Sequence, residues 1–551
     1  MRRAPVDLPA PHGDNNIERE PLWYAYAAGD DEPPVPPWTW TTEPPMTAHV
    51  HPPAPDVVRR GAHVPLPFGT TGLLESVAFP QGRVTAPQPP SGGREFDRVG
   101  HALVAALGAQ WVDPDNAYNP HRGYASPRCL YPVQAFLERG GRRHLVSPET
   151  HSLVEIEAKD KVGVGGGVGV GVGVGGGVGV GVGVGVGVER IILTGRYTRI
   201  PRGYKWFRGS LVNLEVGFVL RSLAIAFDLF GIEGRVRLPD SGSAALLAGL
   251  GLAPAGEWSL PLVIDIGGDA GPGGRPAPAV HAVRDTPAAE QAPPAPAPEQ
   301  APSPKGPSPD DPSLADLVRL NRTHLFPGPP TPLDSGIAPT AHPSTEATSW
   351  AEVMWRRNSG RMPRGLLGMN GRLRRMPAHW LRDAIDWLSV PPPGAVPREV
   401  FDAVRVTAVV QAVDGFEDGI HRIRDGRAEL HREDAAAALR LEREYGYPLG
   451  PEAGCDIRHA SGLWFLTARP RRIVDAFGPA GWSALQYACG WALHGLSLSA
   501  AAYGMFARPV RAFNEIPVQR LLDLQEDEMI TLAAVVGTPR HASGALLDIR
   551  L

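Results

Sequence analysis

The sequence predicts an α+β fold built from two similar halves in tandem, and two observations support this prediction. The segments LVNLEVGFVLRSLAIAFDLFGIEGRVR, from Leu211, and SALQYACGWALHGLSLSAAAYGMFARPVR, from Ser483, share a pattern of glycines and apolar residues. An offset of 273 positions pairs Gly217 with Gly490, Leu220 with Leu493, Gly231 with Gly504 and Arg235 with Arg508. Upstream, RRHLVSPETHSLVEIE and GIHRIRDGRAELHRE are each typical of two short strands around a polar turn. The order hairpin, long helix and basic loop therefore occurs twice.

Each long segment is expected to form a largely buried helix, because small and apolar residues continue through the space between its two glycines. The second glycine, Gly231 or Gly504, provides a stop signal. Unrelated α/β domains can also contain such helices. The agreement of both element order and spacing nevertheless favours duplication over coincidence.

Proline-rich and glycine-rich stretches set the expected domain boundaries. Residues 1–55 and 271–313 carry too much Pro for regular structure and are predicted to be a disordered arm and a Pro/Ala-rich linker. The folded halves are then 56–270 and 314–551. A Gly/Val tract at 162–188 is long enough to span a membrane, but Gly disfavours a regular helix, so we interpret it as an insertion in a surface loop.

Composition excludes several classes of function. The formal net charge is −4, with Lys and Arg scattered along the chain, which argues against a nucleic-acid-binding protein. Cys129, Cys455 and Cys489 form no C-x-x-C pair, and the histidines lack metal-ligand spacing, so no disulfide framework and no metal site is expected. Residues 1–11 contain no apolar segment typical of a secretory signal. We therefore expect a cytoplasmic protein without a membrane span.

The most informative local motif is WRRNSGRMPRG, in which Arg357, Ser359 and Arg361 form R-x-S-x-R after an apolar helix start at Trp350 to Trp355. Guanidinium groups pair bidentately with phosphate oxygens, so two arginines and a hydroxyl at alternate positions suit a phosphate or a polyol. Taken alone, the motif is also compatible with an exposed, Arg-rich helix end.

This motif resembles the R-R-S-x-R-type segment with which domains of the nitroreductase superfamily hold the phosphate and ribityl chain of FMN. Within that superfamily the first half resembles the azoline dehydrogenases of azole-forming peptide pathways, the streptolysin-type group. SPRCLYPVQAFLE, from Ser126, is similar to their S-x-G-x-L-Y-P-x-E/Q strand entry, and NLEVGFVLRSLAIAFDLFG to their buried dimer-interface helix. In the second half the similarity runs from Trp350 to Arg540.

The resemblance implies two nitroreductase-like domains, each with a mixed, mainly antiparallel sheet flanked by helices, paired as an internal pseudo-dimer. It also implies an FMN site in which Arg357, Ser359, Arg361 and Arg540 hold the phosphate end. Ser126 and the adjoining turn would then contact the ring. The first half lacks R-x-S-x-R, although Arg83 lies in the corresponding region, so we expect one complete site formed by both halves.

Catalysis is assigned to Lys205 and Tyr204. The azoline dehydrogenases carry a Lys-Tyr pair for proton transfer, whereas this chain reads GYKWFRG, which retains lysine and displaces tyrosine. A lysine can accept a proton only if burial or nearby positive charge favours its neutral form, and Arg202 and Arg208 are candidate neighbours. The same segment is compatible with an ordinary basic loop. Cys129 has no evident histidine partner and is interpreted as a packed, inert thiol.

The resemblance implies dehydrogenation of thiazoline or oxazoline rings to azoles in a ribosomally made peptide. The partners would be a modified peptide substrate and a cyclodehydratase complex. Two alternatives stay open. An NAD(P)H-dependent nitro or quinone reductase would use the same flavin without requiring the lysine. A flavin-free scaffold of a peptide-modifying complex would explain the incomplete motif of the first half.

Overall fold

The computed structural model describes residues 61–85, 94–112, 121–156, 188–252, 256–267, 311–339, 349–360, 369–445, 457–540 and 547–548. The predicted amino-terminal arm, almost all of the Gly/Val tract and most of the predicted linker lie outside these residues. Arg361 and Cys455 do so as well.

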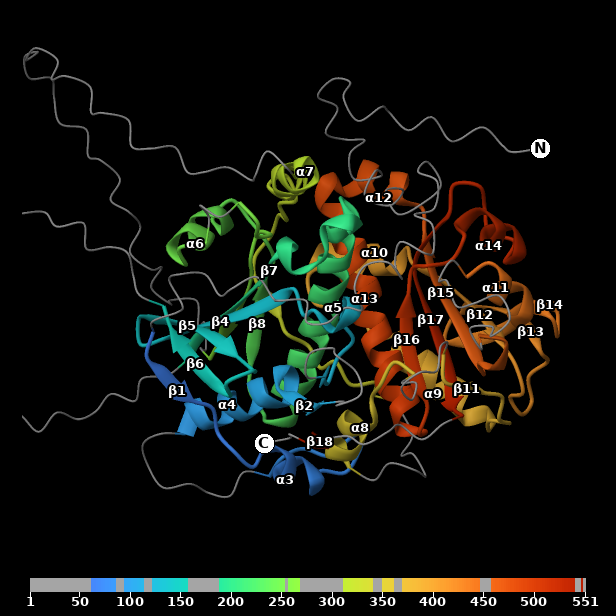
Figure 1. Ribbon diagram of the computed structural model, residues 1–551, viewed down its shortest axis with the longest axis horizontal. Coiled ribbons are helices and arrows are strands. Elements are labelled where there is room, and N and C mark those ends of the chain that lie inside the picture. The colour runs from blue at the N-terminus through green and yellow to red at the C-terminus, as the bar shows by residue number, and fades with distance from the viewer. Residues whose placement is uncertain are drawn as a thin grey trace, which may run out of the picture.

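Two antiparallel sheets form the framework, one at each side of Figure 1. The first has eight strands in the order β1 (His63–Pro65), β6 (Ser152–Glu155), β5 (Arg142–Ser147), β4 (Val133–Arg139), β7 (Val188–Gly195), β9 (Leu262–Ile266), β8 (Gly234–Arg237) and β10 (Thr331–Pro332). The second has seven, in the order β11 (Gly371–Arg372), β17 (Met529–Pro539), β15 (Gly462–Ala468), β12 (Arg405–Val410), β13 (Gly419–Arg424) and β14 (Arg427–Glu433), with β16 (Phe506–Val510) also paired to β17.

The two sheets repeat one strand order. In the first sheet β6, β5, β4, β7, β9 and β8 are neighbours in turn, and in the second β14, β13, β12, β15, β17 and β16 are. Both predicted hairpins are confirmed: β5 pairs with β6 around residues 148–151, and β13 pairs with β14 around residues 425–426. Each half therefore contains the same sequence of paired strands.

Two long helices, α5 (Phe207–Leu229) and α13 (Pro479–Ala502), lie between the sheets and pack against each other (Figure 1). Both are apolar on all sides and almost wholly buried, as the sequence predicts. They end at the expected glycines, where Gly231 and Gly504 adopt positive φ angles of 61° and 66°. By length and composition α5 is apolar enough to cross a membrane, but 94% of its most apolar window is buried inside the protein.

The close approach of the two helices depends on a pair of glycines. A Cβ atom added at Gly217 would lie 2.8 Å from the backbone nitrogen of Trp491, and one added at Gly490 would lie 3.0 Å from the carbonyl carbon of Leu214. Any larger residue would force the helices apart.

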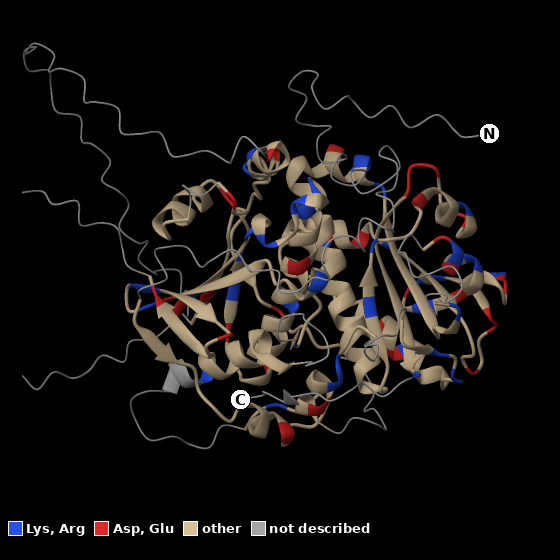
Figure 2. Cartoon of the chain, in the orientation of Figure 1, with Lys and Arg blue, Asp and Glu red and all other residues tan. Residues whose placement is uncertain are grey.

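The remaining helices cover the sheets and the central pair. Around the core lie α3 (Thr70–Glu75), α4 (Arg94–Leu107), α8 (Trp350–Arg356), α9 (Ala378–Leu388), α10 (Ala395–Asp402) and α12 (Pro470–Phe477). Elsewhere lie α6 (Ser243–Gly249), α7 (Pro312–Asn321), α11 (Ala437–Arg443) and α14 (Glu515–Leu521). Lys and Arg alternate with Asp and Glu over both halves in Figure 2, without a stripe of one sign on the described residues.

Residues on both sides of the expected boundary between linker and second half, at 313/314, take part in regular structure, and some residues of the second half pack on the first. Helix α7 begins at Pro312, and β10, at Thr331–Pro332, adds a strand to the first sheet beside β8. At the other end of the chain, β18 (Leu547–Asp548) pairs with β2 (Ala109–Val112) of the first half, which also pairs with β3 (His121–Arg122). Two strands from the range 314–551, β10 and β18, thus pair with strands of the first half. Sequence composition could not indicate these pairings.

Candidate functional site

The entry to β4 is a turn with an unusual backbone. Three non-glycine residues, Arg128, Cys129 and Tyr131, adopt φ angles of 50°, 54° and 48°. Such left-handed conformations cost about 1 kcal/mol or more each, and they persist only where surrounding contacts hold them. The turn that the sequence singled out, starting at Ser126, is therefore a fixed and strained element.

A buried carboxylate holds this turn at both ends. The Ser126 hydroxyl donates a hydrogen bond to Glu215 on α5, and the backbone N–H of Val133 donates to the Glu215 Oε1 atom at 3.1 Å. Ser126 Oγ also accepts the backbone N–H of Tyr131 at 2.8 Å. Because Glu215 is fully buried, desolvation raises its pKa to about 7. Glu215 lies within an apolar run of the sequence, and sequence analysis missed it.

Arg357 reaches the same turn from the second half. It follows α8 directly, is 3% exposed, and donates from Nη2 to the carbonyl oxygen of Arg122 at 3.1 Å. Its Nε and Nη1 atoms have no hydrogen-bond partner among the described residues. Burial lowers the pKa of Arg357, and nearby Tyr131 and Cys129 act in the opposite direction. A buried guanidinium with two unused donors is strongly destabilising unless an anion pairs with it.

The other predicted phosphate contacts are less closely grouped. Ser359 is half-buried two residues beyond Arg357, whereas Arg361 lies outside the described residues. Arg540 is exposed at the end of β17, where its backbone N–H donates to Asn370. Arg508 of β16, which the sequence singled out only as a repeated position, is close enough to Cys129 to lower the pKa of its thiol.

Of the predicted catalytic pair, Tyr204 lies beside the strained turn. The Arg128 guanidinium lies 5.3 Å from the centre of the Tyr204 ring, and Lys205 follows Tyr204 with a φ angle of 43°. The expected role of Arg208 is not supported, however. Arg208 forms a bidentate ion pair with Asp311 and donates through Nε to the Lys205 carbonyl at 2.8 Å. Its charge is therefore compensated, and it orients the Lys205 backbone.

Cys129 differs from expectation in one respect. Its sulfur lies 3.5 Å from Nδ1 of His121, so a histidine neighbour exists, brought there by β3. Burial raises the pKa of the Cys129 thiol to about 11, which keeps it protonated near neutrality. The expectation that Cys129 has no histidine partner was wrong.

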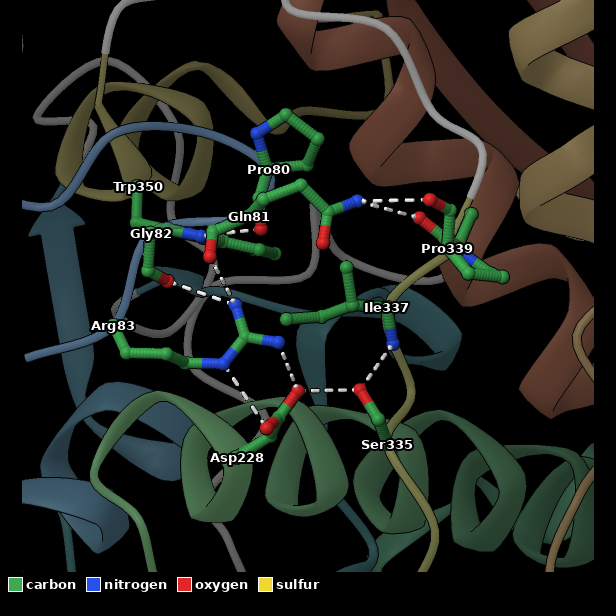
Figure 3. Close-up of polar contacts among 10 residues, drawn as sticks. Pro80, Gln81, Gly82, Arg83, Asp228, Ser335, Ile337, Pro339 and Trp350 are labelled. Atoms are coloured by element: carbon green, nitrogen blue, oxygen red, sulfur yellow. Dashed lines mark hydrogen bonds and ion pairs between the residues drawn. The ribbon is translucent and has the colours of Figure 1, made fainter.

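The corresponding region of the first half holds a different arrangement (Figure 3). Arg83 donates from Nε and Nη2 to the two carboxylate oxygens of Asp228, at 3.0 and 2.6 Å, and from Nη1 to the carbonyls of Gln81 and Gly82. Ser335 donates to the same carboxylate. Each nitrogen of this guanidinium donates at least one hydrogen bond within the protein, and the anion it pairs with is the carboxylate of Asp228.

Space at the site is limited in the described residues. The two best-formed cavities have volumes of about 40 and 10 Å³, and they flank Arg122 and His494. Typical small-molecule sites measure roughly 300 Å³ or more. The Arg357 guanidinium therefore fits the anionic end of a cofactor, and neither of these two cavities would hold a ring system.

Comparison with solved structures identifies the architecture. The chain matches a "putative nitroreductase" from Anabaena variabilis with a TM-score of 0.58 and 14% sequence identity, over 95% of this chain and 99% of that one. The fold is nitroreductase-like. This likeness over both halves confirms the expected combination of helices with antiparallel sheets, and at 14% identity it shows the fold alone.

Shorter matches carry no argument because their TM-scores are low. A "putative nitroreductase" in complex with FMN from Exiguobacterium sibiricum matches with 13% identity and a TM-score of 0.24, over 37% of this chain and 96% of that one. The E. coli microcin synthetase McbBCD complex matches with 12% identity and a TM-score of 0.26, over 33% and 70%. No family model and no curated protein matches the sequence.

Proposed function

We propose that this protein is an FMN-dependent oxidoreductase in which the two halves act as an internal pseudo-dimer with one flavin site between them. The observation that carries the proposal is the buried guanidinium of Arg357. It comes from the second half, has two donors without a partner among the described residues, and lies against a strained turn of the first half. Arg83, in the corresponding region of the first half, already pairs with the carboxylate of Asp228 and donates to two carbonyl oxygens, which supports one site instead of two.

In this proposal Arg357 and Ser359, with Arg361 and Arg540, hold the phosphate and ribityl end, where charge-assisted hydrogen bonds are strongest. Ser126 lies at the ring end, with its hydroxyl fixed by Glu215. Bound FMN would supply an acceptor for a hydride, which carries the two electrons of the oxidation.

We further propose that the substrate is a thiazoline or oxazoline ring of a ribosomally made peptide, delivered by a cyclodehydratase complex. This part rests on the sequence resemblance and on the contact of Tyr204, which precedes Lys205, with Arg128 of the turn. Lys205 would accept the proton from the ring carbon while the hydride leaves the adjacent C–H bond. Loss of both hydrogens forms the aromatic azole. Tyr204, which precedes Lys205 and packs under Arg128, would orient the segment.

One observation favours a second candidate, a flavin-free scaffold of a peptide-modifying complex. Neither the cavity of about 40 Å³ beside Arg122 nor the cavity of about 10 Å³ beside His494 is large enough for an isoalloxazine ring. A scaffold has no need for such a cavity, although the unpaired donors of Arg357 are then unexplained.

The visible spectrum of the full chain after incubation with FMN and removal of free ligand separates these candidates. Flavin absorption at one equivalent per chain is the expected result, whereas a colourless protein would favour the scaffold, and two equivalents would contradict the single site. Azoline oxidation is then compared between the parent and Lys205→Ala. Loss of a general base typically lowers the rate about a hundredfold to ten-thousandfold. Equal turnover with the same flavin content would remove Lys205 from the mechanism.

A further inference from the structure

A second polar cavity adjoins the proposed flavin site within the first half. Its volume is about 40 Å³, and it lies between the start of β4, the end of β5 and helix α5. Arg122, Gln134, Glu149 and Arg199 provide its charged and amide groups. Arg122 connects it to the flavin site, since its carbonyl oxygen accepts the hydrogen bond from Arg357.

Two polar atoms of this lining lack a hydrogen-bond partner among the described residues: Nε of Arg199 and Oε1 of Gln134. Buried polar atoms normally find a partner, so each indicates a missing one. The amide of Gln134 can present its nitrogen instead of its oxygen by a simple rotation. A group placed here would meet the Nε–H of Arg199 and a donor from Gln134.

The cluster brings two guanidinium groups together, and the carboxylates of Glu149 and of the buried Glu215 both interact with Arg199. Burial, together with the positive charge of Arg122, lowers the pKa of Arg199 to about 10. Arg122 itself is 6% exposed and donates to the Tyr124 hydroxyl at 3.0 Å. Two guanidinium groups in low dielectric favour an anionic ligand.

Among the described residues that line this cavity, Glu149 provides the one carboxylate. It lies on the turn between β5 and β6, and its side chain is 49% exposed, whereas that of Arg122 is 7% exposed. The two form an ion pair at 2.8 Å. An ion pair to a half-exposed carboxylate contributes little to stability, so a carboxylate from outside can replace it.

We propose that this cavity is a subsite for a carboxylate group of the peptide substrate, with Arg122 and Arg199 as its ligands and Glu149 as an internal stand-in. The proposal rests on the proposed function for the identity of the ligand. A volume of about 40 Å³ is near that of one or two water molecules, which suits a carboxylate group and not a whole ligand. The rest of the peptide would extend past the exposed turn that carries Glu149.

The test uses the full chain without added flavin and two probes, N-acetylglycine and its neutral amide, with affinities measured by isothermal titration calorimetry. The carboxylate should bind at least about tenfold more tightly than the amide, as expected for losing a charge-assisted hydrogen bond. Glu149→Gln should increase affinity for N-acetylglycine, because it removes the competing carboxylate. Arg199→Gln should remove the preference for carboxylate over amide.

Glu149 lies on an exposed turn, so Glu149→Gln is expected to fold even if Arg199→Gln does not. Unchanged or weaker binding in Glu149→Gln would overturn the proposal and leave the cavity as a site for ordered water. Loss of the carboxylate preference in Arg357→Met, but not in Arg199→Gln, would also overturn it, because the probe would then occupy the proposed phosphate position. Acetate that binds as well as N-acetylglycine would exclude a peptide source.

FMN content is measured separately on each preparation. A protein that binds no FMN but shows the predicted responses to Glu149→Gln and Arg199→Gln would overturn the proposed function and retain the carboxylate subsite. A protein that binds FMN but shows no preference for carboxylate over amide would overturn the carboxylate subsite and retain the proposed function.

Discussion

Gly217 of α5 and Gly490 of α13 lie against each other at the crossing of the two central helices. A Cβ atom on Gly217 would be 3.0 Å from the Cα atom of Gly490, and one on Gly490 would be 3.3 Å from the Cα atom of Gly217. These residues occupy the same position in the two repeated segments. The repeat in the sequence therefore marks a place where the halves make close backbone contact.

Gly217→Ala is expected to destabilise the protein, because the added methyl group overlaps backbone atoms of α13, which cannot rotate away. Overpacking of this kind costs about 1–3 kcal/mol in the free energy of unfolding. Chemical denaturation of the full chain measures it. Gly72→Ala is the matched control, since Gly72 is also helical and its Cβ would meet nothing within 4 Å. That variant should be neutral or more stable by up to about 1 kcal/mol, and similar losses in both variants would contradict the role of the crossing.

The extent of the contact between α5 and α13 also predicts the behaviour of the separated halves. Both helices are buried on all sides, so either half alone would expose a long apolar helix. Expressed alone, each half should be insoluble or aggregated, and co-expression should restore a soluble complex. Size-exclusion chromatography provides the measurement. A well-folded, monomeric single half would show that the central helices do not require each other.

Arg221 of α5 is a buried cation that joins the halves without a carboxylate. It donates to the carbonyl oxygens of Gly336, Trp491 and Trp387 at 2.8 to 2.9 Å, and burial lowers its pKa to about 9. Gly495 leaves room for it, because a Cβ there would lie 2.5 Å from Arg221 Nη2. These carbonyl groups would lose their partner in Arg221→Met, at a cost of about 1–3 kcal/mol each where no water replaces it.

The two positions should therefore be coupled. Gly495→Ala is expected to destabilise the parent protein clearly and to cost much less in an Arg221→Met background, where the clash is absent. A double-mutant cycle of unfolding free energies should give a coupling of about 1 kcal/mol or more. If the two substitutions change the free energy of unfolding additively, Arg221 adjusts to the extra methyl group of Gly495→Ala without losing stability.

Some of this arrangement could be predicted from the sequence, because it depends on local patterns. Gly231 and Gly504 end the helices by the left-handed conformation that glycine adopts most readily. Contacts between distant segments could not be predicted in this way. His121 reaches Cys129 only because β2, β3 and β18 bring it there, and Glu215 is a single charge in an apolar run. The packing of residues 312–332 on the first half likewise depends on tertiary contacts, which composition does not reveal.

Glu215 should make stability depend on pH. Its pKa is raised from 4.5 to about 7 in the folded protein, so the folded state binds more protons than the unfolded state between these values. Stability from this group is then fully present below about pH 4.5 and is lost as pH rises through about 7, by at most roughly 1.4 kcal/mol per pH unit. Glu215→Gln cannot titrate and should lack this decline. Denaturation at pH 5 to 8 checks the difference, and parallel stability profiles for parent and variant would contradict it.

Arg357 should illustrate a conflict between stability and binding. Two of its buried donors are unpaired, so Arg357→Met removes an uncompensated charge and should leave the flavin-free protein equally or more stable. The same change should weaken FMN binding by about tenfold to a hundredfold, since a charge-assisted hydrogen bond is worth about 1.5–3 kcal/mol. Arg356→Met is the control, because Arg356 neighbours Arg357 in the sequence but is partly exposed and paired with Glu352. Fluorescence titration with FMN and denaturation without it are measured on both variants. Equal FMN affinity in Arg357→Met and Arg356→Met would show that the buried guanidinium does not bind the cofactor.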